Sequence, residues 1–459
     1  MLIFFIGLYL FFTLFIGWLS SRFIKNSQDY VLAGRKMPTF VVASGLFATW
    51  FGSETIMGAS SEFSKHGLLG VIEDPFGASL CLLLIGLFFA RPLYKLKLYT
   101  FSDYFRLRFN KKVELVSAIL MIPSYFSWIA AQLVALAVVL NAIAGIPFFI
   151  GVLICASVVL FYTYIGGMWS ISISDTIQTV IIIVGLIALC FQFYYKAGGW
   201  QIISTKIPDG FFRIIPKENT GQAWLTYFAA WITIGWGSIP QQDVFQRVLS
   251  AKSENAAVKG SIISAFLYLT IALLPLAIVF FGIIATPEFK SIDSQLFIPN
   301  LVLLHSNLVM QILFFGALLS AILSTCSAAV LAPATVLAEN IIKPQFGEKI
   351  NDATLLKIMR YSTVLVTFIA VLLSFNNSNI YELVGEASAL SLVALFVPLT
   401  AGLYWKRSNS LGAILSMTLG TLFWIVCLKV KTTTSPMLIG LFVSMLGMII
   451  GSIIKKKNS

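Results

Sequence analysis

Hydrophobic residues run along this chain in long blocks that short polar stretches separate. A helix needs about 20 consecutive apolar residues to cross the ~30 Å hydrocarbon layer of a bilayer. Blocks of that length recur from one end of the chain to the other, and in the ninth block we expect the span itself to begin near Leu308. The pattern predicts thirteen spans, at residues 1–21, 38–62, 67–91, 113–142, 147–165, 173–195, 222–249, 257–285, 299–340, 355–375, 381–404, 409–428 and 435–454.

Continuous apolar runs of this length predict helices rather than barrel strands. Lipid offers no water to unpaired backbone groups, so only helices and closed barrels span it, and barrel strands alternate apolar and polar residues over about ten positions. We therefore predict an all-α integral membrane protein of thirteen transmembrane helices, forming a single transport domain over residues 1–459. The first run lacks a basic leading region and a small-residue cleavage site, so we expect it to be retained as a helix.

Composition agrees with a membrane protein, and the position of the charges explains their imbalance. The 459 residues are 58% hydrophobic and 11% charged, with mean hydropathy +0.92 and net charge +12. With the N-terminus outside, 23 of the 31 basic residues, Arg247 among them, fall in cytoplasmic loops, which is the positive-inside asymmetry. The sequence thus predicts a multi-pass protein of the cell inner (plasma) membrane with its C-terminus cytoplasmic, and it argues against nucleic acid as a partner.

Other classes of protein find little support in the sequence. The five cysteines lie inside apolar runs without metal-ligand spacing, and His66 and His305 are isolated, so we expect no metal cluster. We find no nucleophile motif, no dinucleotide loop and no polar segment large enough for a soluble domain, so an enzyme is disfavoured. Only residues 455–459 follow the last span, so we expect no attached signalling domain, and no obligatory protein partner is evident.

Two of the predicted spans are interrupted by residues that break helices, with polar residues beside each break. Paired interruptions in corresponding spans of two halves indicate a transporter site, because unwound backbone is tolerated where it lines a cavity. If spans 2–6 and 7–11 are inverted repeats, both breaks fall in the first helix of a repeat. The alternative is that the small residues only allow close helix packing. The residues concerned are Gly45, Gly52 and Gly58 in the second span and Gly235, Gly237 and Pro240 in the seventh.

Three polar positions within the spans are candidates for chemistry. A carboxylate at Glu54 is costly at membrane depth unless it faces a wet cavity or a partner, although it could serve only to pin the break. Ala321, Ser324 and Thr325 share one helix face and offer the hard oxygen ligands that Na⁺ needs, although membrane hydroxyls commonly bond their own i−4 carbonyl. Asp175 either caps the start of a helix or places a charge beside a released cation.

Four stretches then bring a known family into view. They are residues 48–58 (ATWFGSETIMG), 166–168 with 174–178 (GGM and SDTIQ), 240–247 with 251–253 (PQQDVFQR and AKS), and 402–407 (GLYWKR). Together, in this order and on these spans, they make the whole chain resemble the sodium:solute symporter family, whose members include proline, pantothenate, galactose and sialic acid symporters.

This resemblance implies a fold and a sodium site. The fold is the 5+5 inverted-repeat core of leucine-type transporters, with a first repeat at 38–195, a second at 222–404, an extra N-terminal helix at 1–21 and two extra helices at 409–454. Sodium would be bound by carbonyls of Ala48, Phe51 and Ala321 and by hydroxyls of Ser324 and Thr325. Asp175 and Ser327 would serve sodium release or a second sodium, which Ala328 puts in doubt because it lacks a hydroxyl.

We therefore expect a symporter that uses Na⁺ as its coupling ion and imports a small organic solute by alternating access. The solute class is left open between an amino acid, a carboxylate, a sugar and a vitamin, and the mix of Trp, Phe, Glu and small hydroxyls favours a polar or zwitterionic one. The side chains expected to line its site are Ser53, Glu54, Thr55, Glu73, Trp236, Gln241 and Gln242.

Overall fold

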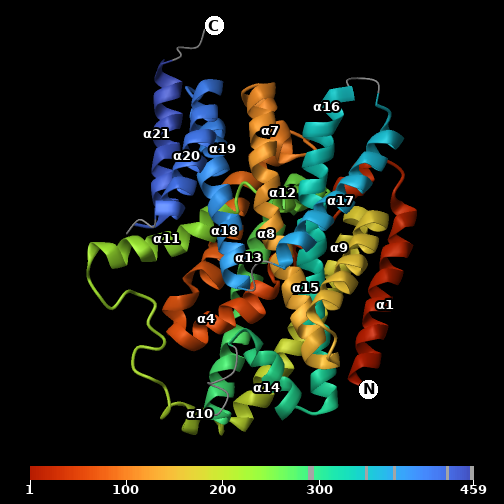
Figure 1. Cartoon of the computed structure of the whole chain (residues 1–459), viewed down its shortest axis with the longest axis vertical. Helices are drawn as coiled ribbons and strands as arrows, with labels where there is room; N and C mark the ends of the chain where they lie inside the picture. The colour runs from red at the N-terminus through yellow and green to blue at the C-terminus, as the bar shows by residue number, and fades with distance from the viewer. Residues whose placement is uncertain (288–293, 347–349, 376–378, 431–433, 455–459) are drawn as a thin grey trace.

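The computed structural model describes the chain except residues 288–293, 347–349, 376–378, 431–433 and 455–459. The regular elements of the described part are helices, and its one β pairing is an isolated bridge between Met37 and Ala251. Figure 1 shows α1 beginning at one end of the bundle and α21 finishing at the other. The prediction of an all-helical protein is therefore confirmed.

The first half of the chain contains the elements α1 (Leu2–Ser20), η1 (Ser21–Phe23), α2 (Ser27–Leu32), η2 (Ala33–Arg35), α3 (Thr39–Trp50), η3 (Glu54–Gly58), α4 (Ala59–His66), η4 (Gly67–Val71), η5 (Ile72–Gly77), α5 (Ala78–Leu84), η6 (Ile85–Phe89), α6 (Ala90–Lys95), α7 (Phe101–Arg108), α8 (Lys111–Ala144), α9 (Phe148–Lys196) and α10 (Gly199–Ile203). The second half contains α11 (Gly221–Gly237), α12 (Gln242–Ser250), α13 (Glu254–Ala285), η8 (Ser294–Leu296), α14 (Phe297–His305), α15 (Leu308–Val336), η9 (Leu337–Ile342), α16 (Lys343–Phe346), α17 (Asp352–Ser374), α18 (Ile380–Ser391), η11 (Leu392–Phe396), α19 (Val397–Tyr404), α20 (Ser410–Val430) and α21 (Pro436–Ile454).

Polar caps begin several of the long helices. The side chain of Asn110 accepts a hydrogen bond from the backbone N–H of Val113 at the start of α8, and Ser253 accepts one from Ala256 at the start of α13. Such caps satisfy backbone donors that the first helical turn leaves unpaired. Polar cap residues therefore define where α8 and α13 begin.

Ten helices of the described chain are long and apolar enough to cross a membrane, so the count of thirteen stays a prediction. Two of the ten are much longer than one crossing requires. The helical stretch Glu54–Lys95 has 42 residues and α9 has 49, which at 1.5 Å per residue would be about 63 and 74 Å if straight. The first stretch turns at Gly67 and the second at Gly167, both with positive φ.

The predicted spans 147–165 and 173–195 leave residues 166–172 as a connection, but the structure places both spans in one helical element. Tyr164 to Gln178 is helical, and the chain changes direction inside α9 at Gly167, whose φ is 47° and ψ is −145°. That backbone conformation suits a glycine, because other residues would place a Cβ in a steric clash. Two predicted spans therefore lie in one element, α9, and Gly167 forms the bend between them.

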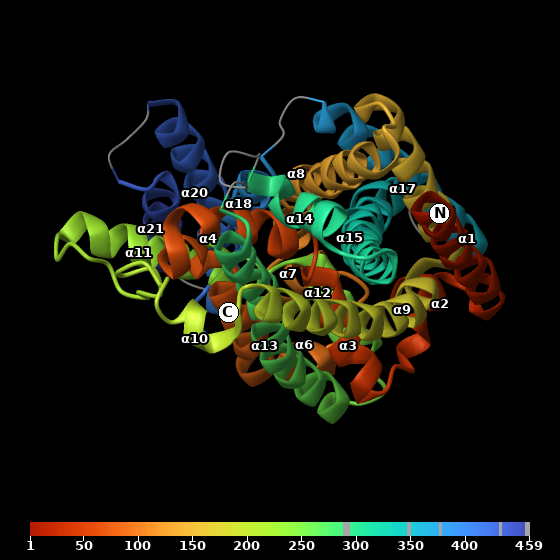
Figure 2. The ribbon, with the colours of Figure 1, turned by 90° about the horizontal axis from the view of Figure 1, so that it is seen from below.

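α15 lies in the middle of the bundle and α11 lies at its edge. Every α15 residue from Ala317 to Val336 is buried, and the helix packs against α9, α8 and α3. Small side chains let neighbouring helices approach closely in a membrane. α11, by contrast, extends sideways across the direction of most other helices in both views (Figures 1 and 2), while α1 presents a row of large apolar side chains outward.

Candidate functional site

The first predicted break is present in the structure. α3 ends at Trp50, Phe51 has φ −86° and ψ 72°, and helical backbone resumes at Ser53 before η3. The carbonyls of the last helical turn have no partner within their own helix, so Ala48 and its neighbours offer oxygens to other groups. The backbone N–H of Ser53 donates to Oε1 of Gln132 at 3.0 Å, which fixes the break against α8.

Two of the predicted sodium ligands, Ala48 and Thr325, meet at this break. The Thr325 hydroxyl on α15 donates to the carbonyl of Ala48 at 3.3 Å, and Ser324 and Thr325 are fully buried. Phe51 is buried within the break, and Ala321 lies one turn before Thr325 on α15. Carbonyl and hydroxyl oxygens around unwound backbone are the ligands that transporters use for Na⁺. The donor set therefore fits a sodium ion.

Gly52 leaves room for oxygen atoms at the same place. A Cβ on this residue would lie 2.5 Å from Oε2 of Glu54, 2.8 Å from Oγ1 of Thr325 and 2.9 Å from Oε1 of Gln132. Real side chains do not approach oxygen atoms so closely, so a substitution here would displace at least one of them. The break thus brings three polar side chains to one point of the backbone.

Asp175 lies well inside α9 rather than at a helix start, so the N-cap interpretation is wrong. The Ser324 hydroxyl donates to Oδ1 of Asp175 at 2.5 Å, and Nη2 of Arg247 lies 3.3 Å from Oδ2. Ser327 turns its hydroxyl back to the carbonyl of Ser324 at 2.9 Å. Asp175 is therefore in contact with Ser324, one of the predicted sodium ligands, whereas the Ser327 hydroxyl bonds the backbone of its own helix.

Arg247 is not a cytoplasmic loop residue, which corrects its place in the charge count. It lies on α12, a helix whose residues are all buried, and is itself 1% exposed. Its guanidinium donates from Nε to the carbonyl of Gly45 at 3.1 Å and from Nη1 to that of Asp243 at 3.1 Å, besides pairing with Asp175. A buried charge needs such partners to offset lost hydration, and a sequence pattern does not reveal them.

The second predicted break is also present, and it meets the first. α11 ends at Gly237, a turn follows, and α12 begins at Gln242. The indole of Trp50, at the end of α3, donates to Oδ2 of Asp243 at 3.1 Å, and the Tyr125 hydroxyl donates to Oδ1 at 2.6 Å. Residues on either side of the two breaks are therefore in direct contact.

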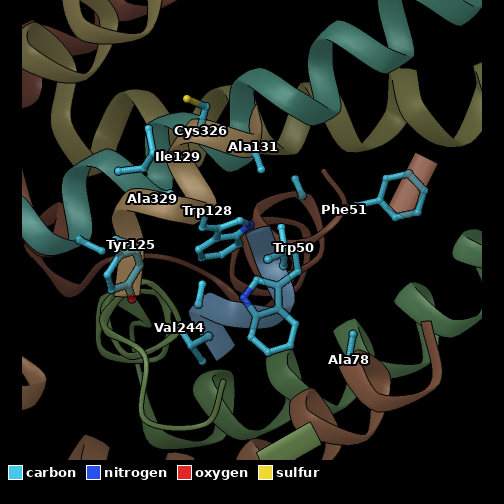
Figure 3. Packing of buried hydrophobic residues seen from close by; sticks show 14 of the residues in the cluster. Trp50, Phe51, Ala78, Tyr125, Trp128, Ile129, Ala131, Val244, Cys326 and Ala329 are labelled. Carbon is cyan, nitrogen blue, oxygen red and sulfur yellow. The ribbon is translucent and has the colours of Figure 1, made fainter. Parts of the chain in front are cut away.

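A small cavity lies between the two breaks. Its volume is ≈ 20 Å³, which is room for about one water molecule. Trp50 and Trp128 lie next to one another at the centre of Figure 3. The complete lining is Trp50, Glu54, Asp74, Ala78, Trp128, Ile234, Ser238, Gln241, Tyr268, Val384, Ala387 and Ser388.

The carboxylates of this cavity are held by side chains from other helices. Glu54 accepts hydrogen bonds from Nε1 of Trp128 at 3.2 Å and from Nε2 of Gln132 at 2.8 Å. Asp74 accepts from the Tyr268 hydroxyl at 2.7 Å and from the Thr55 hydroxyl at 2.8 Å. These bonds tie α8, η5 and α13 to η3 at the first break. Glu54 both pins the break and faces the cavity, so its two interpretations are compatible.

Some side chains expected at the solute site point elsewhere. The ring of Trp236 stacks on Phe396 with centroids 5.3 Å apart, and Oε1 of Gln242 accepts from the backbone N–H of Phe101 at 2.6 Å. Glu73 is half-buried, with Oε2 3.6 Å from where a Cβ of Gly385 would be. None of these three lines the cavity between the breaks.

The remaining expected residues divide in the same way. Glu54 and Gln241 line the cavity, and Thr55 reaches it through Asp74. Ser53 is buried in the break behind it. The first break is thus where the sequence predicted it, and of the residues expected at the second break Gln241 lines the cavity, whereas Trp236 and Gln242 do not.

Several residues of the site were missed by sequence reasoning: Asp74, Trp128, Gln132, Asp243 and Tyr268. Asp74 is beside the chosen Glu73, and Asp243 is inside a quoted family stretch, so both carried a signal. Trp128, Gln132 and Tyr268 lie in long apolar helices where a single aromatic or amide gives no local pattern.

The chain was compared with known proteins. A model of the sodium:solute symporter family matches residues 30–420. The chain is 28% identical over 432 residues to the high-affinity choline transporter 1 of Drosophila melanogaster, covering 91% of this chain and 67% of that protein. It is 25% identical to the sodium/glucose cotransporter of Vibrio parahaemolyticus, with 86% and 78% covered, and 26% identical to the osmoregulated proline transporter OpuE of Bacillus subtilis (strain 168), with 98% and 94% covered.

Solved structures show the same fold. A Na⁺-coupled sialic acid symporter in a substrate-bound outward-open state has TM-score 0.84 at 18% identity, with 99% of this chain and 98% of that chain covered. The nucleobase-cation-symport-1 transporter Mhp1, in a closed conformation, has TM-score 0.59 at 17% identity, with 93% and 94% covered. These relatives are transporters and not enzymes. The chain therefore belongs to the sodium:solute symporter family and is a multi-pass plasma-membrane protein that couples solute transport to sodium.

Proposed function

We propose that the coupling sodium binds at the break of α3 against α15, and that the protein imports a small organic solute bound in the cavity beside it. The observation that carries this proposal is the contact between Thr325 Oγ1 and the Ala48 carbonyl, because it brings hydroxyl and unwound-backbone oxygens together. The ligands are the carbonyls of Ala48, Phe51 and Ala321 and the hydroxyls of Ser324 and Thr325.

Transport then follows by alternating access between two repeats of five helices, at 38–195 and 222–404. Sodium shifts the equilibrium between the two orientations only by its differential affinity for them. Because linkage is reciprocal, sodium and solute each raise the affinity for the other. The joined breaks support this coupling: Glu54 and the sodium ligand Thr325 both approach Gly52, so sodium at the break and solute in the cavity act on the same few residues.

The names of the relatives leave the solute class open. They cover choline, glucose and proline, which are a cation, a neutral sugar and a zwitterion. The identities of 25–28% do not choose among them. The four classes left open by the sequence, an amino acid, a carboxylate, a sugar and a vitamin, therefore stay proposals, as does the polar or zwitterionic character favoured there.

The sodium assignment is tested by thermal unfolding of the purified full chain in NaCl and in KCl. We expect Na⁺, and not K⁺, to raise the melting temperature, and Ser324→Ala and Thr325→Ala each to reduce that rise. Ser320→Ala is the matched control, because its hydroxyl lies on the same helix but bonds the Tyr9 hydroxyl at 2.7 Å. Equal shifts in both salts, or an unchanged sodium effect in both variants, would reject the site.

A further inference from the structure

We propose that the solute is a small organic cation with a methylated ammonium group, held among the rings of Trp50, Trp128 and Tyr268. This inference deepens the proposed function and rests on it for the coupling to sodium. The rings come from α3, α8 and α13, and all three line the cavity between the two breaks.

The charge of the cavity favours a cation. Glu54 and Asp74 line it, whereas its lining, among the described residues, includes no lysine, arginine or histidine. Arg247 forms an ion pair with Asp175 and donates hydrogen bonds to two backbone carbonyls. Coulomb energies grow large where water is excluded. A carboxylate solute would meet two like charges here, and a neutral sugar would leave them without a counterion.

The aromatic side chains are oriented by Glu54, Asp74 and a third acid, Asp243. The indole N–H of Trp128 points to Glu54, that of Trp50 points to Asp243, and the Tyr268 hydroxyl points to Asp74. Each ring is therefore anchored by its polar edge, so a solute that contacts these rings would meet their carbon atoms rather than a hydrogen-bond donor. Aromatic faces attract cations, and cages of this kind recognise quaternary ammonium groups.

The hydrogen bonds of the carboxylates favour a methylated ammonium over a primary one. Both oxygens of Asp74 and both oxygens of Glu54 already accept a hydrogen bond from the protein. A primary ammonium brings three N–H donors that need acceptors. A methylated ammonium brings charge with few or no donors, so it suits acids whose oxygens are already engaged and rings that offer only their faces.

The size of the cavity indicates that binding requires motion. At ≈ 20 Å³ it is too small for an organic cation. Its wall combines α3, η5 and α8 from the first half of the chain with α11, α13 and α18 from the second half. Separation of these two groups of helices would open the cage, so the cation binds while one face is open and is enclosed as the helices close.

The test compares choline with its neutral carbon isostere 3,3-dimethylbutan-1-ol, which differs in charge and not in shape. Binding is measured by thermal shift and by competition with labelled choline on the full chain in proteoliposomes, in NaCl and in KCl. We expect choline to bind in a sodium-dependent way. The isostere should bind at least about tenfold more weakly than choline, because it lacks the cation–π and ionic contributions. Equal affinity for the two would overturn the proposal.

Proline and glucose are measured in parallel, so that failure of this inference differs from failure of the proposed function. Sodium-dependent uptake of either, without uptake of choline, would overturn the cation proposal and leave symport intact. A protein that Na⁺ does not stabilise more than K⁺, and that takes up none of the solutes, would contradict both proposals.

Three tryptophan variants test whether the rings of Trp50, Trp128 and Tyr268 hold the solute. Trp128→Leu should weaken choline binding about tenfold or more, and Trp224→Leu is the matched control because Trp224 is exposed on α11. Trp128→Phe keeps an aromatic face without the indole N–H and should retain most of the affinity. Equal affinities in Trp128→Leu and the control would overturn the cage. If Trp128→Leu does not fold, Trp128→Phe and the isostere comparison decide the question.

Discussion

The guanidinium of Arg247 lies 3.3 Å from the carboxylate of Asp175, and both side chains are withdrawn from solvent. The pair connects α12 to α9, and the Ser324 hydroxyl joins it to α15. A substitution at Asp175 therefore does two things at once. It removes a charge close to the proposed sodium ligands, and it leaves a buried arginine without its counterion.

We predict that Asp175→Asn and Arg247→Gln each destabilise the protein by roughly 3–5 kcal/mol, since each strands one buried charge. The double variant carries no charge at the pair and should recover much of that loss. Thermal unfolding of the four proteins in NaCl measures the coupling. Additive losses would mean that the ion pair does not act as a unit.

The same double variant distinguishes an effect of Asp175 on stability from an effect on sodium binding. If the Asp175 charge serves sodium directly, apparent sodium affinity in uptake assays falls even where stability is recovered. Wild-type sodium dependence in the double variant would show that Asp175 serves only Arg247.

Gly52→Ala should impair sodium and solute binding together. Its Cβ would come within 2.9 Å of three oxygen atoms at the break, and overpacking of this kind costs about 1–3 kcal/mol. Gly316→Ala on α15 is the control, because a Cβ there meets nothing within 4 Å. Sodium-induced thermal shift and solute uptake are the measurements, and a Gly52→Ala protein that matches the Gly316→Ala protein would contradict the geometry.

Adjacent acids should differ in their effect on the solute. Asp74 is 1% exposed and lines the cavity, whereas Glu73 is half-buried beside Gly385. Asp74→Asn should lower apparent solute affinity about tenfold or more, because a desolvated charge is lost. Glu73→Gln should have the smaller effect. Uptake as a function of solute concentration checks the order, and a larger effect at Glu73 would reverse the assignment.

The orientation of the chain is a further prediction. Reporter fusions after Arg22 and after Lys457 should both read cytoplasmic, because the basic residues of the connecting loops set orientation. The removal of Arg247 from the loop count lowers the cytoplasmic total by one and leaves the asymmetry large. Opposite readings at the two positions would mean that a span has been counted wrongly.

The sequence predicted those features that depend on local pattern. The long apolar runs form helices, and the helix breaks lie at Gly52 and after Gly237, as predicted. The Thr325 hydroxyl on α15 contacts the first break, whereas the Ser324 hydroxyl bonds Asp175. Each of these follows from spacing along a single helix.

What the sequence did not show depends on contacts between distant segments. Trp50 and Asp243 are 193 positions apart, and Tyr268 and Asp74 are 194 apart. Whether a side chain beside a break faces the cavity or a neighbouring helix is decided by that packing. Gln241 and Gln242 illustrate the point, because one lines the cavity and the other bonds the backbone at Phe101.

The narrow space between the breaks has an electrical consequence. A membrane potential of 100 mV drives each elementary charge with about 2.3 kcal/mol, so an open column of water would let ions leak down the gradient. A cavity of ≈ 20 Å³ has no room for a hydrated sodium ion beside Trp50 and Trp128. If transport passes through a state packed as tightly as this around the two indoles, the energy of the sodium gradient is kept for cycles that move solute.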